Sequence, residues 1–407
     1  MLHQFSLYVL CVFLAIGSSL LITPAIRKYA IKKNLYDIPN GRSSHKKPIP
    51  RIGGIAIIAS FLATSLFGSC LALFVLSDIP CDLVETVVVI SGGLLIAAVG
   101  LYDDIKGMRA VVKLGFQIFV AVYAVSFGLK IDLSGFFNGT HLEAYASVAS
   151  FILSVFWIVS ILNAVNLMDG LDGLAGGISA IAMSALFVLL YMAGSLTSPI
   201  IALALIGAVI GFLYHNYHPA SIFMGDTGSL FLGFVLATFP LPLSFDFASS
   251  YGLWLIPLCV LYLPLFDMTS CFIRRICEGR SPFSADKKHL HHRIYSKHCN
   301  GDKKGYRKTV HRLYGIAVVF TLLSIVPFMR LEFSSILIVL GVAAMTLNLL
   351  VRYHYLDPIF DAMRARRRLR YIKAYRRRLR ATATSSLRSE QRVVSGGKRE
   401  EPVSASY

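Results

Sequence analysis

The chain has 407 residues, of which 56% are hydrophobic and only 15% are charged, and its formal net charge is +18. Soluble globular proteins carry about 25% charged residues, so this composition excludes an ordinary soluble domain. Several apolar runs reach the roughly 20 residues that cross a bilayer as a helix. The composition therefore predicts an all-α, polytopic integral membrane protein.

Eleven apolar runs are predicted to cross the membrane. In chain order they cover residues 5–23, 52–76, 84–101, 113–129, 148–166, 177–194, 198–214, 228–243, 251–273, 313–330 and 335–352. Residues 1–352 then form one transmembrane domain, because no polar stretch before residue 350 is long enough to bury its own core. Residues 353–407 form a basic tail whose end, rich in Ser, Thr, Ala and Gly, is predicted to be disordered.

The basic residues predict which side of the domain faces the cytoplasm. Of the 40 Lys and Arg residues, 38 lie in segments on one side of the eleven-span arrangement, namely 24–51, 102–113, 274–312 and 352–407. Because basic loops stay in the cytoplasm, we expect the N-terminus outside and the tail inside. Ten basic residues between 364 and 380 favour anionic lipid headgroups over nucleic acid as the partner of the tail.

One polar motif stands between two apolar runs. Residues 163–173 read Asn-Ala-Val-Asn-Leu-Met-Asp-Gly-Leu-Asp-Gly, with carboxamides at Asn163 and Asn166 and carboxylates at Asp169 and Asp172. Such groups are costly at the end of a membrane helix, which marks them as a site. Their oxygen atoms favour a divalent cation, and a cation at a membrane surface indicates phosphate chemistry.

Two further acidic motifs stand on the same predicted side of the membrane. Asp103 and Asp104 end one apolar run, where a carboxylate opposes the helix dipole. Asp226 lies in Gly-Asp-Thr-Gly at residues 225–228, just before another run begins. Either motif alone could be a structural cap. Together they favour one active site, because free N–H groups at the starts of outgoing helices attract an anionic substrate.

Basic loops on this side carry further candidates for phosphate binding. Lys47 and Arg51 lie in a loop broken by Pro and Gly, which predicts either a phosphate cradle or only a positive-inside loop. A later loop carries three histidines and an arginine: His289, His291, His292 and Arg293. Zinc is disfavoured there, because no Cys pair is nearby and the spacing does not place three histidines on one helix face. A polyanion such as pyrophosphate fits this cluster better.

This set of motifs resembles that of the polyprenyl-phosphate N-acetylhexosamine-1-phosphate transferases, or glycosyltransferase 4 family. The likeness runs from about residue 37 to residue 293 and covers five motifs in matching order. Ser-Pro-Phe-Ser at 281–284 followed by His-Leu-His-His at 289–292 is similar to the WecA branch. That branch transfers GlcNAc-1-phosphate from UDP-GlcNAc to undecaprenyl phosphate and releases UMP. The alternative is the same reaction with another UDP-sugar, carrying FucNAc, QuiNAc, GalNAc or MurNAc-pentapeptide.

The resemblance implies a role for each candidate residue. Asp226 and Asn166 are implied as ligands of Mg²⁺, for which Mn²⁺ can substitute. The implied catalytic residues are Asp103, Asp104, Asp169 and Asp172. The implied substrate-binding residues are His289, His291, His292, Arg293, Asn163, Asn216, Lys47 and Arg51. Asp267, near the inner end of the ninth run, is either a sugar contact or, as we favour, a buried structural carboxylate.

The resemblance also predicts the setting of the reaction. The enzyme would work in the bacterial cytoplasmic membrane, with its active site on the cytoplasmic face, at the first membrane step of a cell-surface glycan pathway. The UDP-sugar and undecaprenyl phosphate are its implied partners, and a homodimer is compatible with the family. A secondary transporter is disfavoured, because transporters place their carboxylates near the middle of the bilayer.

Overall fold

The computed structural model describes residues 2–39, 47–75, 83–137, 141, 143–195, 197–241, 255–281, 289–298, 303–326, 334–353 and 355. These residues form α-helices and one small antiparallel sheet, in which β1 (Tyr36–Asp37) pairs with β2 (Ile49–Pro50). The predicted helical, polytopic class is confirmed, and the sheet is an addition that the sequence did not indicate. Most of the predicted tail, from residue 356 onward, lies outside the described residues.

Within the described residues, each predicted run overlaps at least one helix. The helices are α1 (Leu2–Lys32), α2 (Gly54–Val75), α3 (Leu83–Lys106), α4 (Ala110–Ser126), α6 (Glu143–Met168), α7 (Leu174–Met192), α8 (Thr197–Asn216), α9 (Gly225–Thr238), α10 (Ile256–Val260) with α11 (Tyr262–Cys277), α13 (Lys303–Leu323) and α14 (Ser334–Arg352). Two short helices complete the set, α5 (Ser134–Phe137) and α12 (Leu290–His298). Within the described part of the chain, six helices are long and apolar enough to cross a membrane: α1, α2, α3, α6, α7 and α8. The count of eleven spans and their orientation stay predictions.

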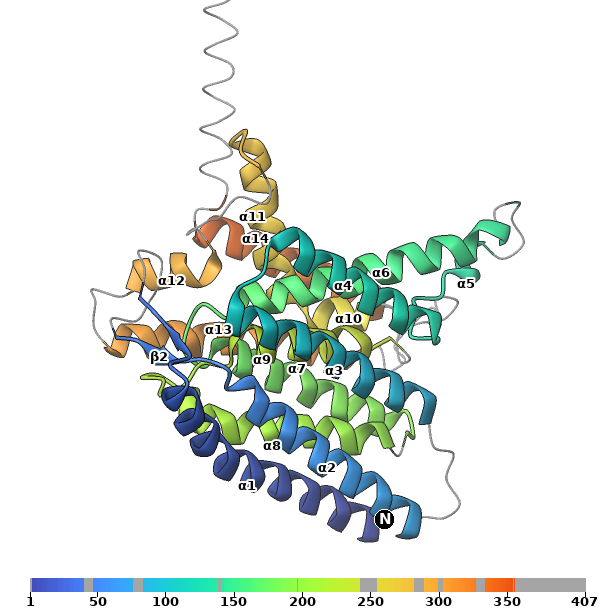
Figure 1. Ribbon diagram of the computed structural model, residues 1–407. Helices are drawn as coiled ribbons and strands as arrows, with labels where there is room; N and C mark the ends of the chain where they lie inside the picture. Colours follow the sequence, from blue (N-terminus) through green and yellow to red (C-terminus); the bar gives the residue numbers. More distant parts are fainter. Residues whose placement is uncertain are drawn as a thin grey trace, which may run out of the picture.

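Helix α9 is the centre of the bundle. Every residue from Thr227 to Thr238 is buried, and the helix packs against α2, α3, α6 and α7 (Figure 1). Helix α1 lies at the periphery, where Phe5, Phe13 and Leu21 are exposed. Large apolar side chains on an outer surface are what a membrane protein turns toward lipid tails. The bundle thus has an apolar outside and a tightly enclosed central helix.

Glycines allow two neighbouring helices to touch the first turn of α9. A Cβ atom on Gly54, at the start of α2, would lie 2.2 Å from the backbone nitrogen of Gly228. A Cβ atom on Gly100, in α3, would lie 2.4 Å from the carbonyl oxygen of Asp226. Only a residue without a side chain fits at such distances. These contacts bring the polar end of α3 directly beside the start of α9.

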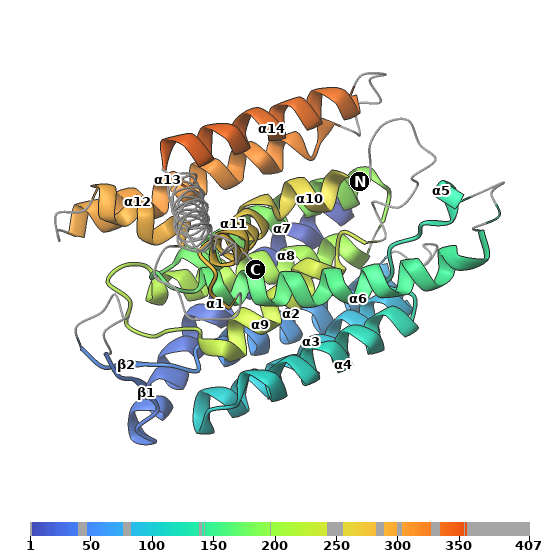
Figure 2. The same ribbon diagram turned by 90° about the horizontal axis from the view of Figure 1, so that it is seen from above.

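Backbone hydrogen bonds join the β2 segment to the segment that enters α9. The Phe223 N–H donates to the Pro50 carbonyl at 2.8 Å, and the Gly53 N–H donates back to the Phe223 carbonyl at 2.8 Å. Both strands and α12 lie at one end of the bundle, opposite the end that carries α5 (Figure 2). We call the end with β1, β2 and α12 the polar end. The pairing holds Arg51 at this end, next to the start of α9.

The close approach at Gly54 predicts a strong sensitivity to one methyl group. Gly54→Ala should lower the unfolding free energy by about 1–3 kcal/mol, the usual cost of overpacking, because the contact is with rigid backbone. Gly115→Ala in α4 is the matched control, since nothing lies within 4 Å of its Cβ position. Thermal unfolding in detergent measures both variants. Equal unfolding temperatures for the two variants would contradict the packing described above.

Candidate active site

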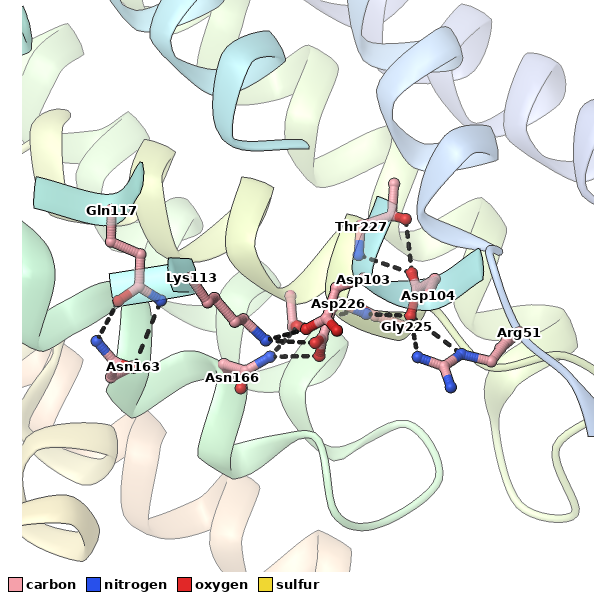
Figure 3. A network of polar contacts seen from close by, with 11 residues as sticks. Arg51, Asp103, Asp104, Lys113, Gln117, Asn163, Asn166, Gly225, Asp226 and Thr227 are labelled. Carbon is pink, nitrogen blue, oxygen red and sulfur yellow. Dashed lines mark hydrogen bonds and ion pairs between the residues drawn. The ribbon is translucent and has the colours of Figure 1, made fainter. Parts of the chain in front are cut away.

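A cluster of charged side chains lies at the polar end, where α3, α4, α6 and α9 meet (Figure 3). Asp103 is in the last turn of α3, and its Oδ2 accepts a hydrogen bond from Lys113 Nζ at 2.9 Å. The same ammonium donates to Oδ2 of Asp226, in the first turn of α9. Asn166, near the end of α6, donates through Nδ2 to Asp226 Oδ1 at 2.8 Å. The structure therefore brings Asp103, Asn166 and Asp226 together from three helices around one lysine.

Asp104 is a further member of this cluster, and it caps α9 from a neighbouring helix. Its Oδ1 accepts hydrogen bonds from the Asp226 N–H at 3.0 Å and from Arg51 Nη2 at 2.5 Å. Its Oδ2 accepts from the Thr227 N–H at 2.9 Å and from the Thr227 hydroxyl at 2.6 Å. Free N–H groups at a helix start need such an acceptor. A Cβ atom at Gly225 would collide with this carboxylate, 2.5 Å from its Oδ2.

Exposure separates the three carboxylates of the cluster. The side chain of Asp104 is 0% exposed, whereas that of Asp103 is 14% exposed and that of Asp226 is 26% exposed. Asp103 and Asp226 can therefore meet a ligand that enters from the polar end, while Asp104 is fully occupied by the protein. Two carboxylates share one ammonium, so the pair keeps an excess of negative charge that favours a cation.

The two remaining aspartates of the 163–173 motif lie in the loop between α6 and α7. Asp169 is half-buried, and burial together with the nearby charges of Asp226 and Asp104 raises its pKa to about 8. Asp172 is buried, and its Oδ2 contacts His218 Nδ1 at 2.8 Å and accepts from the Ala220 N–H at 3.0 Å. Asp172 thus joins this loop to the loop between α8 and α9.

Two predicted substrate contacts make polar contacts inside the protein. The Asn163 amide donates to Gln117 Oε1 at 2.8 Å, in the interface between α6 and α4. Asn216 is buried, accepts from the Gly173 N–H at 3.0 Å, and donates to the Ile222 carbonyl at 2.9 Å. Both amides hold elements of the polar end in place. Their contact with substrate stays a prediction.

The predicted basic residues are divided between the cluster and the surface. Arg51 contacts Asp104 and so belongs to the cluster. Lys47 is exposed just before β2. His292 and Arg293 are half-buried on α12.

The other two histidines lie deeper in the protein. His289 and His291 are 5% and 1% exposed. His289 Nδ1 lies 3.0 Å from Oδ2 of Asp267, which is itself 1% exposed, in agreement with the preferred structural role of that aspartate.

The histidine segment also reaches the 163–173 motif. A Cβ atom on Gly170 would lie 2.7 Å from Nε2 of His291, so the imidazole packs directly on the loop that carries Asp169 and Asp172. Burial lowers the pKa of His291 to about 3, and its ring is therefore neutral at pH 7. His291 therefore lies next to the loop of the 163–173 motif, although more than a hundred residues separate the two in sequence.

Comparison with known proteins matches residues 86–244 to the family described as "Glycosyl transferase family 4". The "Probable undecaprenyl-phosphate N-acetylglucosaminyl 1-phosphate transferase" of Bacillus subtilis (strain 168) is 36% identical over 310 residues, which cover 75% of this chain and 81% of the relative. The chain belongs to glycosyl transferase family 4. This confirms the resemblance found in the motifs.

Two further relatives have a lower identity to this chain. The "Decaprenyl-phosphate N-acetylglucosaminephosphotransferase" of Mycolicibacterium smegmatis is 34% identical, over 66% of this chain and 70% of the relative. The "Undecaprenyl-phosphate alpha-N-acetylglucosaminyl 1-phosphate transferase" of Salmonella typhi is 29% identical, over 66% of this chain and 71% of the relative. The region matched to the family contains the whole carboxylate cluster except Arg51, and it ends before the histidine segment.

Sequence reasoning missed three residues of this candidate site. Lys113 was read only as the end of a basic loop, although an ionisable residue in the first turn of an apolar helix signals a site. Thr227 was read as part of a motif, and nothing in its position indicated Asp104 as its partner. Gln117 is buried in α4 opposite Asn163, and a carboxamide inside an apolar run is the signal that could have found it.

The different environments of the two adjacent aspartates predict different consequences of the same substitution. Asp104→Asn should lower the unfolding free energy by about 3 kcal/mol or more, because an amide group would face the donors of Arg51 and Thr227. Asp103→Asn should leave the unfolding temperature nearly unchanged, because Asp226 still pairs with Lys113. Thermal unfolding in detergent compares the two. A larger loss with Asp103→Asn would show that Asp104 does not cap α9.

The pair of His289 and Asp267 predicts a dependence of stability on pH. Burial opposes the charged imidazole, but the hydrogen bond and charge of Asp267 outweigh it and raise the pKa of His289 to about 10. The ordinary value is about 6.5, so the pair stabilises the fold fully below pH 6.5 and progressively less toward pH 10. The difference in unfolding temperature between the wild type and His289→Gln should therefore be larger at pH 6.5 than at pH 9.5. A difference that widens at pH 9.5 would refute the charged state of His289.

Proposed function

We propose that this chain transfers N-acetylglucosamine 1-phosphate from UDP-GlcNAc to a polyprenyl phosphate and releases UMP. The printed names of the B. subtilis, M. smegmatis and S. typhi relatives describe transfer of this sugar phosphate to undecaprenyl or decaprenyl phosphate. The observation that carries the proposal is the cluster of Asp103, Lys113, Asn166 and Asp226 at the polar end. The carboxylate and carboxamide oxygens there can bind a cation, and the ammonium group of Lys113 can contact a diphosphate.

The cluster fits Mg²⁺ on the chemistry of its donor atoms. Mg²⁺ takes oxygen ligands, usually one or two carboxylates together with phosphate oxygens. Asp226 and Asn166 would hold the ion, and Asp103 faces the same place, since Lys113 contacts both carboxylates. When bound, the ion would neutralise charge on the diphosphate of the donor.

The reaction needs positioning more than it needs a strong base. An oxygen of the lipid phosphate attacks the β-phosphorus of UDP-GlcNAc, and the bond from that phosphorus to the oxygen of UMP breaks. The second pKa of a phosphate monoester is about 6, so most of the acceptor is already ionised at pH 7. Asp103 is exposed enough to orient it, whereas every oxygen of Asp104 is taken by Arg51 and α9. We therefore propose that Asp103 orients the phosphate of the acceptor. Asp104 holds Arg51 and the start of α9 in place.

The setting of the reaction belongs to the same proposal. The polar end would face the cytoplasm, because 38 of the 40 Lys and Arg residues lie in segments on one predicted side of the membrane. The tail, which lies mostly outside the described residues, would bind anionic lipids. A homodimer stays a prediction.

The test is release of UMP by the purified full-length protein in detergent. UDP-GlcNAc, UDP-GalNAc, UDP-FucNAc, UDP-QuiNAc and UDP-MurNAc-pentapeptide are offered separately, each with undecaprenyl or decaprenyl phosphate, with and without Mg²⁺. We expect Mg²⁺-dependent UMP with UDP-GlcNAc and a loss of at least 100-fold in Asp226→Asn, because a direct ligand of the ion is removed.

One control variant and two alternative outcomes decide how this assay is interpreted. Asp132→Asn is the matched carboxylate variant, at the far end of the bundle before α5, and it should keep the wild-type rate. UMP formed only with a different UDP-sugar would replace the donor in the proposal and keep the chemistry. No UMP with any donor, from protein with a wild-type unfolding temperature, would refute the proposed function.

A further inference from the structure

Asp267 stands at the centre of a buried contact that the proposed reaction does not use. It lies on α11, and its Oδ1 accepts a hydrogen bond from the Leu290 N–H at 2.6 Å, at the start of α12. Its Oδ2 lies 3.0 Å from His289 Nδ1. Tyr355, which follows α14, donates its hydroxyl to Oδ1 at 3.4 Å. One carboxylate therefore joins three segments that are far apart in sequence.

Tyr355 makes a second attachment to α12. Its ring is buried and lies under the guanidinium of Arg293, with 4.2 Å between Arg293 Cζ and the ring centroid. Such a cation–π contact is worth more when it is shielded from water. Arg293 also donates through Nη1 to the carbonyl of Tyr353 at 3.0 Å. The segment after α14 thus contacts both α12 and Asp267 of α11.

These contacts at α12 determine where His291 lies. His291 packs on Gly170, and its Nδ1 lies 3.9 Å from Asp267 Oδ2. Among the described residues this Nδ1 has no hydrogen-bond partner. The ring is held by packing between Asp267 and the loop of the 163–173 motif. Any movement of the start of α12 would therefore change how His291 meets that loop.

We propose that Asp267, His289 and Tyr355 form a latch that holds the histidine segment 291–293 against the loop carrying Asp169 and Gly170. These three are positioning residues, whereas His292 and Arg293 stay the predicted contacts of the diphosphate and sugar of the donor. His289, predicted from sequence as a substrate contact, then acts through its pairing with Asp267. The kinetic part of this inference rests on the proposed function, while the existence of the latch does not.

A metal ion is the competing explanation for this cluster. Asp267, Cys271 and His289 offer three ligand atoms within 4.8 Å of one another, and all three residues are buried. However, both oxygens of Asp267 already accept hydrogen bonds, from the Leu290 N–H and from His289. The imidazolium of His289 supplies the positive charge that a metal would bring. The hydrogen-bonded latch therefore accounts for the geometry without an ion.

The first test measures the latch without any enzyme assay. Cys271 is 1% exposed beneath His289, with 3.4 Å between Sγ and Nδ1, and it should react with a thiol reagent only when α12 moves away. Alkylation of the full-length protein is followed by mass spectrometry, with the half-buried Cys277 of the same helix as internal reference. We expect Cys271 to react at least tenfold faster in Asp267→Asn and in Tyr355→Leu, relative to Cys277. Glu278→Gln, a carboxylate variant at the end of α11, should leave this ratio unchanged.

The second test separates positioning from general damage. In Asp267→Asn and Tyr355→Leu, the KM for UDP-GlcNAc should rise about tenfold, while kcat stays within threefold and the KM for the polyprenyl phosphate does not change. Tyr355→Phe keeps the ring under Arg293 and should recover most of the affinity. A fall in kcat with an unchanged KM for the donor would refute the positioning role.

Two further outcomes would overturn the latch itself. Unchanged reactivity of Cys271 in a folded Asp267→Asn protein would show that α12 is held by other contacts. One equivalent of zinc in the purified wild type, lost in Cys271→Ser, would make the cluster a metal site. If no UDP-sugar is turned over, the proposed function fails, and the alkylation result still decides whether the latch exists.

Discussion

The carboxylate of Asp104 is the interaction on which the polar end depends. It binds two N–H groups of α9, the hydroxyl of Thr227 and the guanidinium of Arg51, and so joins α3, α9 and the β2 segment in one place. Burying a carboxylate is unfavourable unless its oxygens accept hydrogen bonds. Here the N–H groups of Asp226 and Thr227, which have no partner within α9, donate to it. Because Asp103 is the next residue, fixing Asp104 also fixes the carboxylate that faces a ligand.

Much of this arrangement could be predicted from sequence. The apolar runs predicted the helices, and the three polar motifs predicted that Asp103, Asn166 and Asp226 share one end of the bundle. Both predictions rest on local signals, namely hydropathy over about 20 residues and polar groups where lipid would exclude them. The length of α9 was overestimated, because the apolar run continues to residue 243 while the helix ends at Thr238.

The features that sequence could not reveal are long-range pairings. Nothing in the spacing of Asp104 and Thr227, 123 positions apart, indicates a hydrogen bond. Asp267, His289 and Tyr355 come from three segments, and nothing in the sequence pairs the histidine motif with Asp267 or Tyr355. The sheet of β1 and β2 has two residues in each strand, too few for any periodic pattern. Such contacts are decided by packing, which a linear pattern of residue types does not contain.

The length of α3 determines the depth at which the carboxylate cluster lies. Asp103 follows Leu83, the first residue of α3, by twenty positions, which is a rise of about 30 Å along a helix. The hydrocarbon core of a bilayer is also about 30 Å thick. A helix that starts at one boundary of the core therefore delivers its acidic end to the level of the opposite headgroups. A phosphate anchored to a polyprenyl chain already resides at this level, so it could reach Asp103 by lateral diffusion, with its tail still dissolved in lipid.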